Sequence, residues 1–291
     1  MDKPSLRAFL EVAECGSFSL AADKLGLTQP AVSKRIAALE HHLDTSLFDR
    51  IGRQVTLTEA GRALMPRAEG IIQSIADAEL SVKDLSGLVS GRLSLATSHH
   101  IGLHKLPRVL RRFTQRYPAV VLDLDFLDSE RAYDLMLRGK IELSVVTLDP
   151  VMDPAFSAAV VWPDPLHLAF APEHPLAESD AIELASLSEY PAILPGLNTY
   201  TGQIVSNLFR ERDLDLNISM STNYLETIKM MVSIGLGWSI LPAGMLDPPL
   251  CSIDLGEPGL HRDLGYVFLR KRSLSNAARA FIEELVKEPS G

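Results

Sequence analysis

Residues 17–39, SFSLAADKLGLTQPAVSKRIAAL, decide how the first part of this 291-residue chain folds. Apolar residues recur at helical spacing in two short stretches of this segment. Gly26 separates the stretches, because glycine enters the left-handed conformation at little cost. Thr28 is placed to cap the second stretch, and Pro30 fits its first turn because the N–H that proline lacks has no helical partner there. The segment therefore predicts two helices joined by a tight turn.

The second helix has a polar outer surface. Val32, Ile36 and Leu39 fall on one face and are expected to pack inward. The side chains on the other face, near the helix N-terminus, are amides, hydroxyls and cations, which suit base edges and phosphates in a DNA major groove. These candidate DNA-binding residues are Thr28, Gln29, Pro30, Ser33, Lys34 and Arg35. Any amphipathic helix pair could produce the apolar spacing alone, so the interpretation depends on the flanking sequence.

The flanks contain the other parts that such a domain needs. Upstream, an apolar helix face ends at Gly16 and predicts a third helix. Downstream, residues 47–61, LFDRIGRQVTLTEAG, hold two strand-like runs around a short turn, which predicts a hairpin wing. Arg50 and Arg53 lie at this turn and are candidates for contact with phosphates or the DNA minor groove.

The order of SFSLAADKLGLTQPAVSKRIAALE, LFDR and LTEAG resembles the N-terminal domain of LysR-type transcriptional regulators. The likeness is dense over residues 1–62. It implies a winged helix-turn-helix domain over residues 1–58, with the helix-turn-helix at about residues 18–37. It also implies double-stranded promoter DNA as a partner and a homotetramer built as a dimer of dimers. RNA polymerase is then a candidate further partner.

The net charge of −9 at pH 7 first argues against a DNA-binding protein. The charges are unevenly distributed, however. Residues 1–62 hold eight Lys/Arg and eight Asp/Glu, whereas the remainder holds 20 and 29. Because the local field matters more than the total, the first part can still bind DNA, and the acidic remainder is expected to stay off the duplex. A single balanced domain should bind weakly and depend on pairing in a dimer.

The sequence predicts a soluble, cytoplasmic protein without membrane contact. The N-terminal MDKPSLRAF is charged and lacks the apolar core of a signal peptide. The longest uncharged run, residues 230–246, is too short and too broken to span a bilayer. Cys15 and Cys251 form no CxxC motif, which favours a reducing compartment with no disulfide framework.

A heptad repeat marks residues 59–89 as a linker and dimerisation helix. Its unbroken alternation of four- and three-residue steps is typical of a helix that pairs with another of the same kind. The alternative is a lone amphipathic helix that lies on its own domain. The repeat positions are Leu64, Ala68, Ile71, Ile75, Ala78, Val82 and Leu85.

From residue 90 to 291 strands alternate with helices, which predicts an α/β domain with parallel strands. Strands are expected at 92–97, 119–126 and 141–147, with helices at 101–116 and 129–139. The same order returns at 191–241, which indicates two lobes: lobe I at about 92–160 and 265–291, and lobe II at about 161–264. Residues 156–171 should cross between them, and 276–287 should form a last helix. The resemblance implies a two-lobed, periplasmic-binding-protein-like effector domain.

Ligands of such sheets bind beyond the carboxyl ends of strands, near helix N-termini. The residues at these positions are rich in hydroxyls, which favours a small carboxylate, a sulfate-like anion or another compact polar effector. Ordinary helix capping is the alternative role for each of them. The candidate effector-binding residues are Ser98, His99, Ser129, Thr147, Asn198, Thr199 and Thr201.

Other chemistry has weaker support. His100 and His104 have the spacing of metal ligands, but no Cys, Asp or Glu stands at ligand spacing beside them, so no metal site is expected. No dinucleotide fingerprint, nucleophile elbow or Walker loop occurs, so neither catalytic residues nor a cofactor are expected. The sequence therefore predicts a non-enzymatic DNA-binding transcriptional regulator that responds to a small effector. The alternative is a DNA-binding module fused to a ligand-carrying or catalytic α/β domain.

Overall fold

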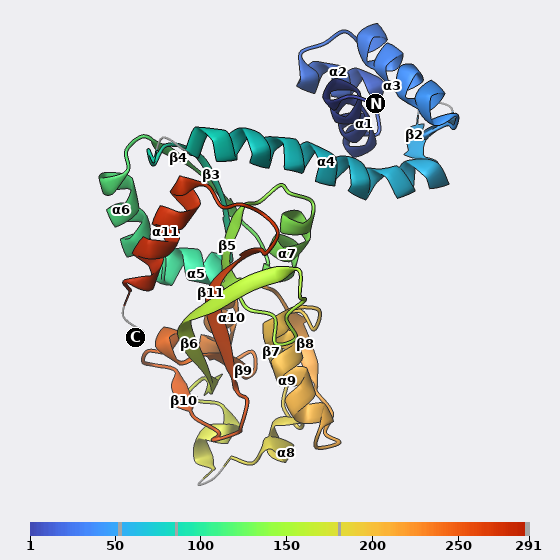
Figure 1. The fold of residues 1–291 in the computed structure, drawn as a ribbon. Coiled ribbons are helices and arrows are strands. Elements are labelled where there is room, and N and C mark those ends of the chain that lie inside the picture. The colour runs from blue at the N-terminus through green and yellow to red at the C-terminus, as the bar shows by residue number, and fades with distance from the viewer. Residues whose placement is uncertain (52–53, 85–86, 180–181, 289–291) are drawn as a thin grey trace. The chain divides into compact units, whose positions relative to one another are not determined.

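A computed structural model describes residues 1–51, 54–84, 87–179 and 182–288, without the side chains of residues 50, 51, 54, 77, 80, 81, 83 and 84. The chain divides into two compact units, Met1–Ser86 and Gly87–Gly291 (Figure 1). Among the described helices, none has the length and apolar character needed to cross a membrane.

The first unit has the predicted helices and hairpin. Gly16 and Gly26 end the first two helices in the left-handed conformation, with φ of 59° and 64°. Ser17 caps the second helix by accepting a hydrogen bond from the Leu20 N–H. Thr28 occupies the cap position of the third helix, but its side chain makes no capping hydrogen bond. The elements are α1 (Lys3–Cys15), α2 (Phe18–Leu25), α3 (Gln29–Leu43), β1 (Phe48–Ile51), β2 (Gln54–Leu57) and α4 (Glu59–Asp84).

The core of this unit lies between the three short helices and the hairpin. Phe48 of β1 packs its ring against Phe9 and Phe18, with ring centroids 5.4 and 5.8 Å apart. The predicted inward face of α3 is fully buried here. Burial of these side chains stabilises the unit and leaves the opposite face of α3 exposed.

The heptad positions of α4 fall into two groups. Leu64 and Ala68 pack into the core of the first unit. This end of α4 therefore lies on its own domain, as expected for a lone amphipathic helix. Further along, Ala78 is exposed and Val82 is 69% exposed. Leu85 lies outside the described residues. The second group is therefore not covered by other described residues of the chain.

The first lobe of the second unit contains a parallel sheet, as predicted. Strand β3 pairs in parallel with both β4 and β5. The single helix expected at 101–116 is wrong: the chain breaks at Lys105 and Leu106, and Pro107 starts a new helix because it cannot donate to the preceding turn. The elements are β3 (Gly91–Thr97), α5 (His99–His104), α6 (Pro107–Arg116), β4 (Val120–Phe126), α7 (Ser129–Leu137), β5 (Leu143–Thr147) and α11 (Asn276–Val286).

The second lobe has a partly parallel order. Strands β7 and β8 pair in parallel, but β9 pairs antiparallel with β6. Trp238, which directly precedes β9, forms an isolated parallel bridge with Ala192 of β7. Trp238 is fully buried and stacks on Phe209. The elements are α8 (Leu184–Leu187), β7 (Ala192–Leu194), α9 (Tyr200–Arg210), β8 (Ile218–Ser221), α10 (Leu225–Ser233), β9 (Ser239–Pro242) and β10 (Cys251–Ile253), with 3₁₀ turns at Pro175–Glu178 and Ala243–Met245.

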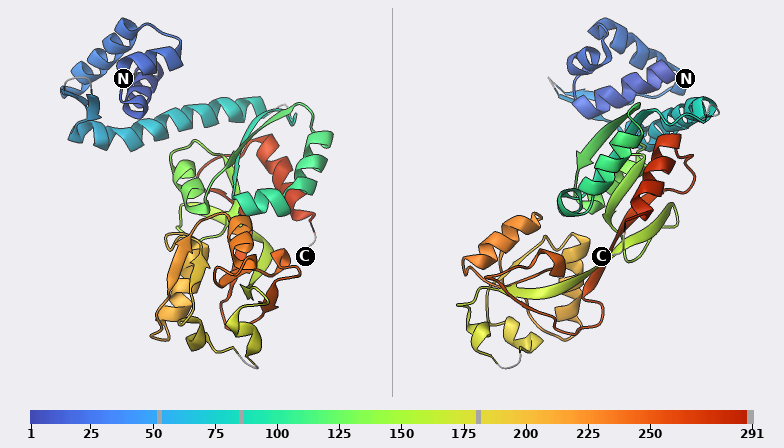
Figure 2. Two further views of the ribbon diagram at one scale, coloured as in Figure 1. Left: turned by 180° about the vertical axis from the view of Figure 1, so that it is seen from behind. Right: turned by 90° about the vertical axis from the view of Figure 1, so that its left-hand side faces the viewer.

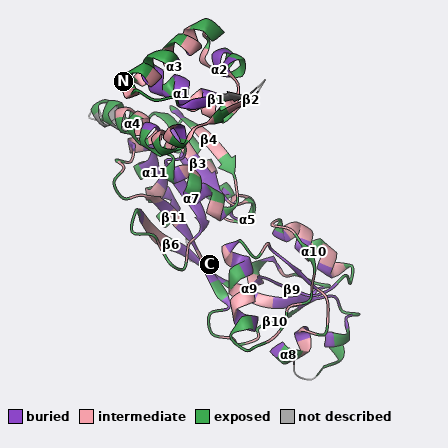
Figure 3. Cartoon of the chain, turned by 90° about the vertical axis from the view of Figure 1, so that its right-hand side faces the viewer, coloured by how far each residue is buried: buried purple, intermediate pink, exposed green. Residues whose placement is uncertain are grey.

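Two long antiparallel strands, β6 (Phe156–Phe170) and β11 (His261–Leu269), run from one lobe into the other (Figures 1 and 2). Trp162 and Leu264 lie in the first-lobe core, whereas Leu166 lies in the second-lobe core. The crossing therefore falls a few residues further along β6 than the boundary expected from the sequence. Figure 3 shows buried residues along strands such as β3 and β11 in the first lobe and β9 in the second.

Candidate nucleic-acid interface and ligand cavity

The outer face of α3 carries the residues predicted to contact DNA. Thr28, Gln29, Pro30 and Lys34 are exposed, and Ser33 and Arg35 are half-buried. The Gln29 side-chain amide donates to Ser33 Oγ at 3.0 Å, which holds two of these polar groups together one helical turn apart. Hydrogen bonds from Ser5 lower the pKa of Asp2, and the nearby charge of Arg35 adds to this effect.

The hairpin wing is tied to α3 by a contact that the sequence analysis did not identify. Glu40 Oε1 accepts hydrogen bonds from the backbone N–H groups of Leu47, at 2.7 Å, and Phe48. This fixes the start of β1 relative to the polar face of α3. Of the two predicted wing residues, Arg50 lies on β1 but its side chain is not described, and Arg53 lies outside the described residues.

A cavity of about 330 Å³ lies between the lobes of the second unit, at the carboxyl ends of β3, β4 and β5. This volume is at the small end of the range for ligand pockets. Six of the seven predicted effector residues line the cavity: Ser98, His99, Ser129, Thr147, Thr199 and Thr201. Asn198 is exposed and does not line it.

The hydroxyl groups of these residues differ in the hydrogen bonds that they already make within the protein. Thr199 caps α9, because its Oγ1 accepts from Gly202 N–H at 3.1 Å and donates to Gly196 O at 2.7 Å. Ser129 Oγ accepts from Thr147 N–H at 3.1 Å and keeps its own proton available. Ser98 stands at the N-cap of α5 without making a capping hydrogen bond. Capping therefore accounts for Thr199, whereas Ser98 and Ser129 can still donate to a ligand.

Arg262 of β11 also lines the cavity, although it is not among the residues predicted from the sequence. Only 6% of its surface is exposed. Its Nε donates to Asp164 Oδ2 at 2.7 Å, and its Nη1 donates to Thr201 Oγ1 at 3.0 Å. Its Nη2 is buried and has no hydrogen-bond partner among the described residues. A buried guanidinium N–H without a partner is costly, so this group favours an anion in the cavity.

Acidic side chains at the cavity join the two lobes. Glu130 of α7 accepts a hydrogen bond from Tyr200 N–H of α9 at 2.5 Å, and Asn223 donates to Asp128 at 2.8 Å. Burial raises the pKa of Glu130 above its ordinary value. Burial and the charge of Asp149, which accepts from the Tyr200 hydroxyl, also raise the pKa of Tyr200. These contacts stabilise the lobe arrangement that encloses the cavity.

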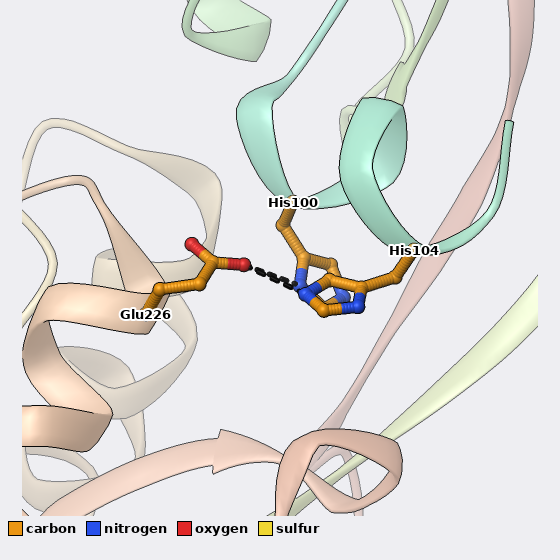
Figure 4. A group of neighbouring side chains, drawn as sticks. All are labelled: His100, His104 and Glu226. Atoms are coloured by element: carbon orange, nitrogen blue, oxygen red, sulfur yellow. Dashed lines mark hydrogen bonds and ion pairs between the residues drawn. The ribbon is translucent and has the colours of Figure 1, made fainter. Parts of the chain in front are cut away.

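His100, His104 and Glu226 form a second interlobe cluster beside the cavity (Figure 4). Glu226 of α10 has Oε1 2.8 Å from His104 Nε2 and 3.7 Å from His100 Nδ1. Burial lowers the pKa of His100 to about 3, and the charge of Arg262 contributes to this shift. His100 is therefore neutral at physiological pH.

Comparison with known proteins gives a consistent result over the whole chain. Residues 4–62 match the family described as bacterial regulatory helix-turn-helix protein, lysR family, and residues 86–290 match the LysR substrate binding domain. The RuBisCO operon transcriptional regulator of Allochromatium vinosum is 31% identical over 97% of this chain and 95% of its own length. A probable nitrogen assimilation transcriptional activator of Synechococcus elongatus is 33% identical over 90% of this chain and 87% of its own.

Solved structures share the fold. A full-length OxyR variant from Pseudomonas aeruginosa aligns with a TM-score of 0.75 at 19% identity, covering 100% of this chain and 96% of that chain. Full-length CbnR in complex with its target DNA aligns with a TM-score of 0.66 at 22% identity, covering 98% and 99%. At these identities the likeness concerns the fold.

Proposed function

This chain belongs to the LysR family of DNA-binding transcriptional regulators, and we propose from that premise that a compact anion bound between its lobes controls how it engages promoter DNA. The observation that carries the proposal is Arg262, whose buried Nη2 lacks a partner among the described residues in a cavity lined by hydroxyl groups. A carboxylate or similar oxyanion would accept from this nitrogen and from Ser98 and Ser129.

For DNA, we propose that the polar face of α3 enters a major groove and that the wing contacts the adjacent backbone. The exposed Gln29 and Lys34 and the half-buried Arg35 are the best placed described groups for base and phosphate contacts. A protein that binds promoter DNA in this way would act in the cytoplasm. RNA polymerase would then be a further partner at the promoter. The named relatives are transcriptional regulators, which favours this function over the catalytic alternative.

The effector site is tested by thermal shift of the full chain against a panel of small carboxylic and inorganic acids. A ligand should raise the melting temperature by mass action, by an amount that increases with its concentration. Ser98→Ala should reduce this shift because it removes a free donor from the cavity. Ser252→Ala, at an exposed serine of β10 outside the cavity, is the matched control. If no acid raises the melting temperature, or if Ser98→Ala and Thr147→Ala both retain the full shift, the cavity assignment is wrong.

DNA binding is tested by fluorescence anisotropy with promoter DNA from the protein's own locus. Arg35→Ala should weaken binding and reduce its salt dependence, since each phosphate contact contributes a slope of about 0.9 to log K against log salt. Arg138→Ala removes the same charge from the second unit and should leave affinity and slope unchanged. Equal affinities for the Arg35→Ala protein and the wild type would exclude Arg35 from the interface.

A further inference from the structure

The cluster of His100, His104 and Glu226 brings together side chains from two lobes. His100 and His104 lie one turn apart on α5, and Glu226 lies in the first turn of α10. One ligand-type atom from each residue lies within 4.8 Å of the other two. In Figure 4 the Glu226 carboxylate extends from α10 toward the two imidazole rings of α5.

These separations fit a common metal coordination sphere. Tetrahedral zinc binds His nitrogen and carboxylate oxygen at about 2.0–2.2 Å, so its ligand atoms lie roughly 3.3 Å from each other. The two distances from Glu226 Oε1, 2.8 Å to His104 Nε2 and 3.7 Å to His100 Nδ1, bracket this value. Two imidazoles and one carboxylate are also a ligand set that proteins use for zinc with an open fourth position.

The hydrogen bonding within the cluster is incomplete without a further group. Only 6% of the His100 surface is exposed, and its Nδ1 has no hydrogen-bond partner among the described residues. Glu226 Oε2 is also buried without one in this described part of the chain. The contact between His104 and Glu226 Oε1 therefore leaves two buried polar atoms of the cluster, His100 Nδ1 and Glu226 Oε2, without a hydrogen bond within the described chain. A cation between these groups would satisfy the lone pairs that remain.

The local charges are compatible with a divalent cation. A metal ligand must be a neutral imidazole or an ionised carboxylate, and the cluster offers two imidazoles and one carboxylate. The nearby guanidinium of Arg262 is itself paired with Asp164 at 2.7 Å, which offsets its charge. Glu226 supplies one negative charge, so the ion would be only partly neutralised and could hold water or an anion at the open position.

We propose that His100, His104 and Glu226 bind a zinc ion that joins α5 of the first lobe to α10 of the second. The ion favours the arrangement in which the two helices approach, because its three ligands come from both lobes and all must reach it. Zinc binding is thus coupled to lobe closure. Its three ligands differ from the proposed anion-binding residues Arg262 and Ser98, although His100 also lines the cavity. This inference goes beyond the proposed function and does not depend on it.

The experiment measures zinc binding to the full chain after treatment with a chelator. Titration with Zn²⁺ in competition with a chromophoric chelator should give one site per chain. His104→Ala and Glu226→Gln should each weaken this site by about tenfold or more, since each removes one of three ligands. His261→Gln changes an exposed histidine of β11 outside the cluster and should bind zinc like the wild type.

Cobalt gives a second readout that a merely structural role would not produce. Co²⁺ bound by the wild type should show the visible absorption of a four-coordinate site, and Glu226→Gln should reduce that absorption while its melting temperature without metal stays close to that of the wild type. The proposal is overturned if the wild type takes up no zinc in competition with the chelator. It is also overturned if His104→Ala and Glu226→Gln bind zinc as tightly as the wild type does.

Discussion

At the scale of single residues, two glycines of α4 differ in what surrounds them. A Cβ added at Gly61 would lie 2.2 Å from the backbone oxygen of Leu47 and 2.8 Å from a methyl group of Leu57. A Cβ added at Gly70 meets nothing within 4 Å. Gly61 therefore allows the close approach of α4 to the hairpin wing, whereas Gly70 serves no such contact in the described chain.

We predict that Gly61→Ala displaces the wing, because a backbone oxygen cannot move aside as a side chain can. The variant should lower the melting temperature of the first unit and weaken DNA binding in an anisotropy titration. Gly70→Ala is the matched control in the same helix. It should be neutral or stabilise by about 1 kcal/mol, since alanine favours a helix interior over glycine. If both variants melt and bind DNA alike, the contact at Leu47 does not hold the wing.

Glu284 of α11 contributes a pH-dependent part of the stability of the second unit. Its buried carboxylate lies 2.7 Å from Lys287 Nζ and 2.8 Å from Arg116 Nη1. The hydrogen bond from Lys287, with support from Arg116, holds the pKa of Glu284 below its ordinary value of 4.5. The stabilisation is therefore present above about pH 4.5 and is lost as the pH falls through the lower pKa of the folded state.

Glu284→Gln should lower the melting temperature at neutral pH and should reduce the fall of the melting temperature as the pH decreases below about 4.5. Both cations are more than half exposed, so solvent screening limits the effect to about 1 kcal/mol, or about 2–4 °C in melting temperature. Glu283→Gln makes the same chemical change at the exposed neighbouring position and should leave the profile unaltered. The ion pairs would be irrelevant to stability if the two variants melted identically from pH 3 to pH 7.

At the scale of elements, α4 has one part in the core of the first unit and another with exposed apolar side chains. Ala78 and Val82 continue the heptad spacing of Leu64 and Ala68 but are uncovered in a single chain. A parallel or antiparallel partner helix would bury them. This supports a dimer through α4.

Val82→Glu should therefore weaken dimerisation by about tenfold or more, because it places a charge at a heptad core position. Light scattering across a dilution series measures the monomer–dimer equilibrium. Ala76→Glu, at an exposed position of α4 outside the heptad, is the matched control and should not change the equilibrium. A Val82→Glu protein that stays dimeric at the same dilution as the control would rule out this face of the helix.

Elements set by local sequence were predictable, and those set by distant packing were not. Ser17, Gly26 and Pro30 act within one helical turn, so the boundaries of α2 and α3 follow from short-range chemistry. The break before Pro107 has a local cause as well, but the apolar spacing across it obscured the boundary.

The same distinction applies to the candidate sites. Hydroxyls such as Ser98 and Thr199 could be found because they follow strands and open helices. Arg262 sits within a strand, and only the packing of the lobes buries its side chain. Glu226 is 122 residues from His104, so its position beside the histidines depends on how α5 and α10 meet across the lobes.

At the scale of the whole molecule, effector and DNA are proposed to bind in separate compact units, so any regulation must appear as coupling between two binding equilibria. Thermodynamic linkage makes this coupling reciprocal: the factor by which an effector changes the affinity for DNA equals the factor by which DNA changes the affinity for the effector. A regulator of the proposed kind should show a factor of about 5 to 150.

The prediction is tested with the acid that gives the largest thermal shift and with promoter DNA. Anisotropy titrations with and without the acid give one factor, and calorimetric titrations of the acid with and without DNA give the other. The two should agree and differ clearly from one. Ser98→Ala should raise the acid concentration needed to change the affinity for DNA. Without the acid, the variant should bind DNA like the wild type, because the substitution lies in the second unit. A factor of one in both titrations would mean that the units act independently, as in a DNA-binding module fused to a ligand-carrying domain.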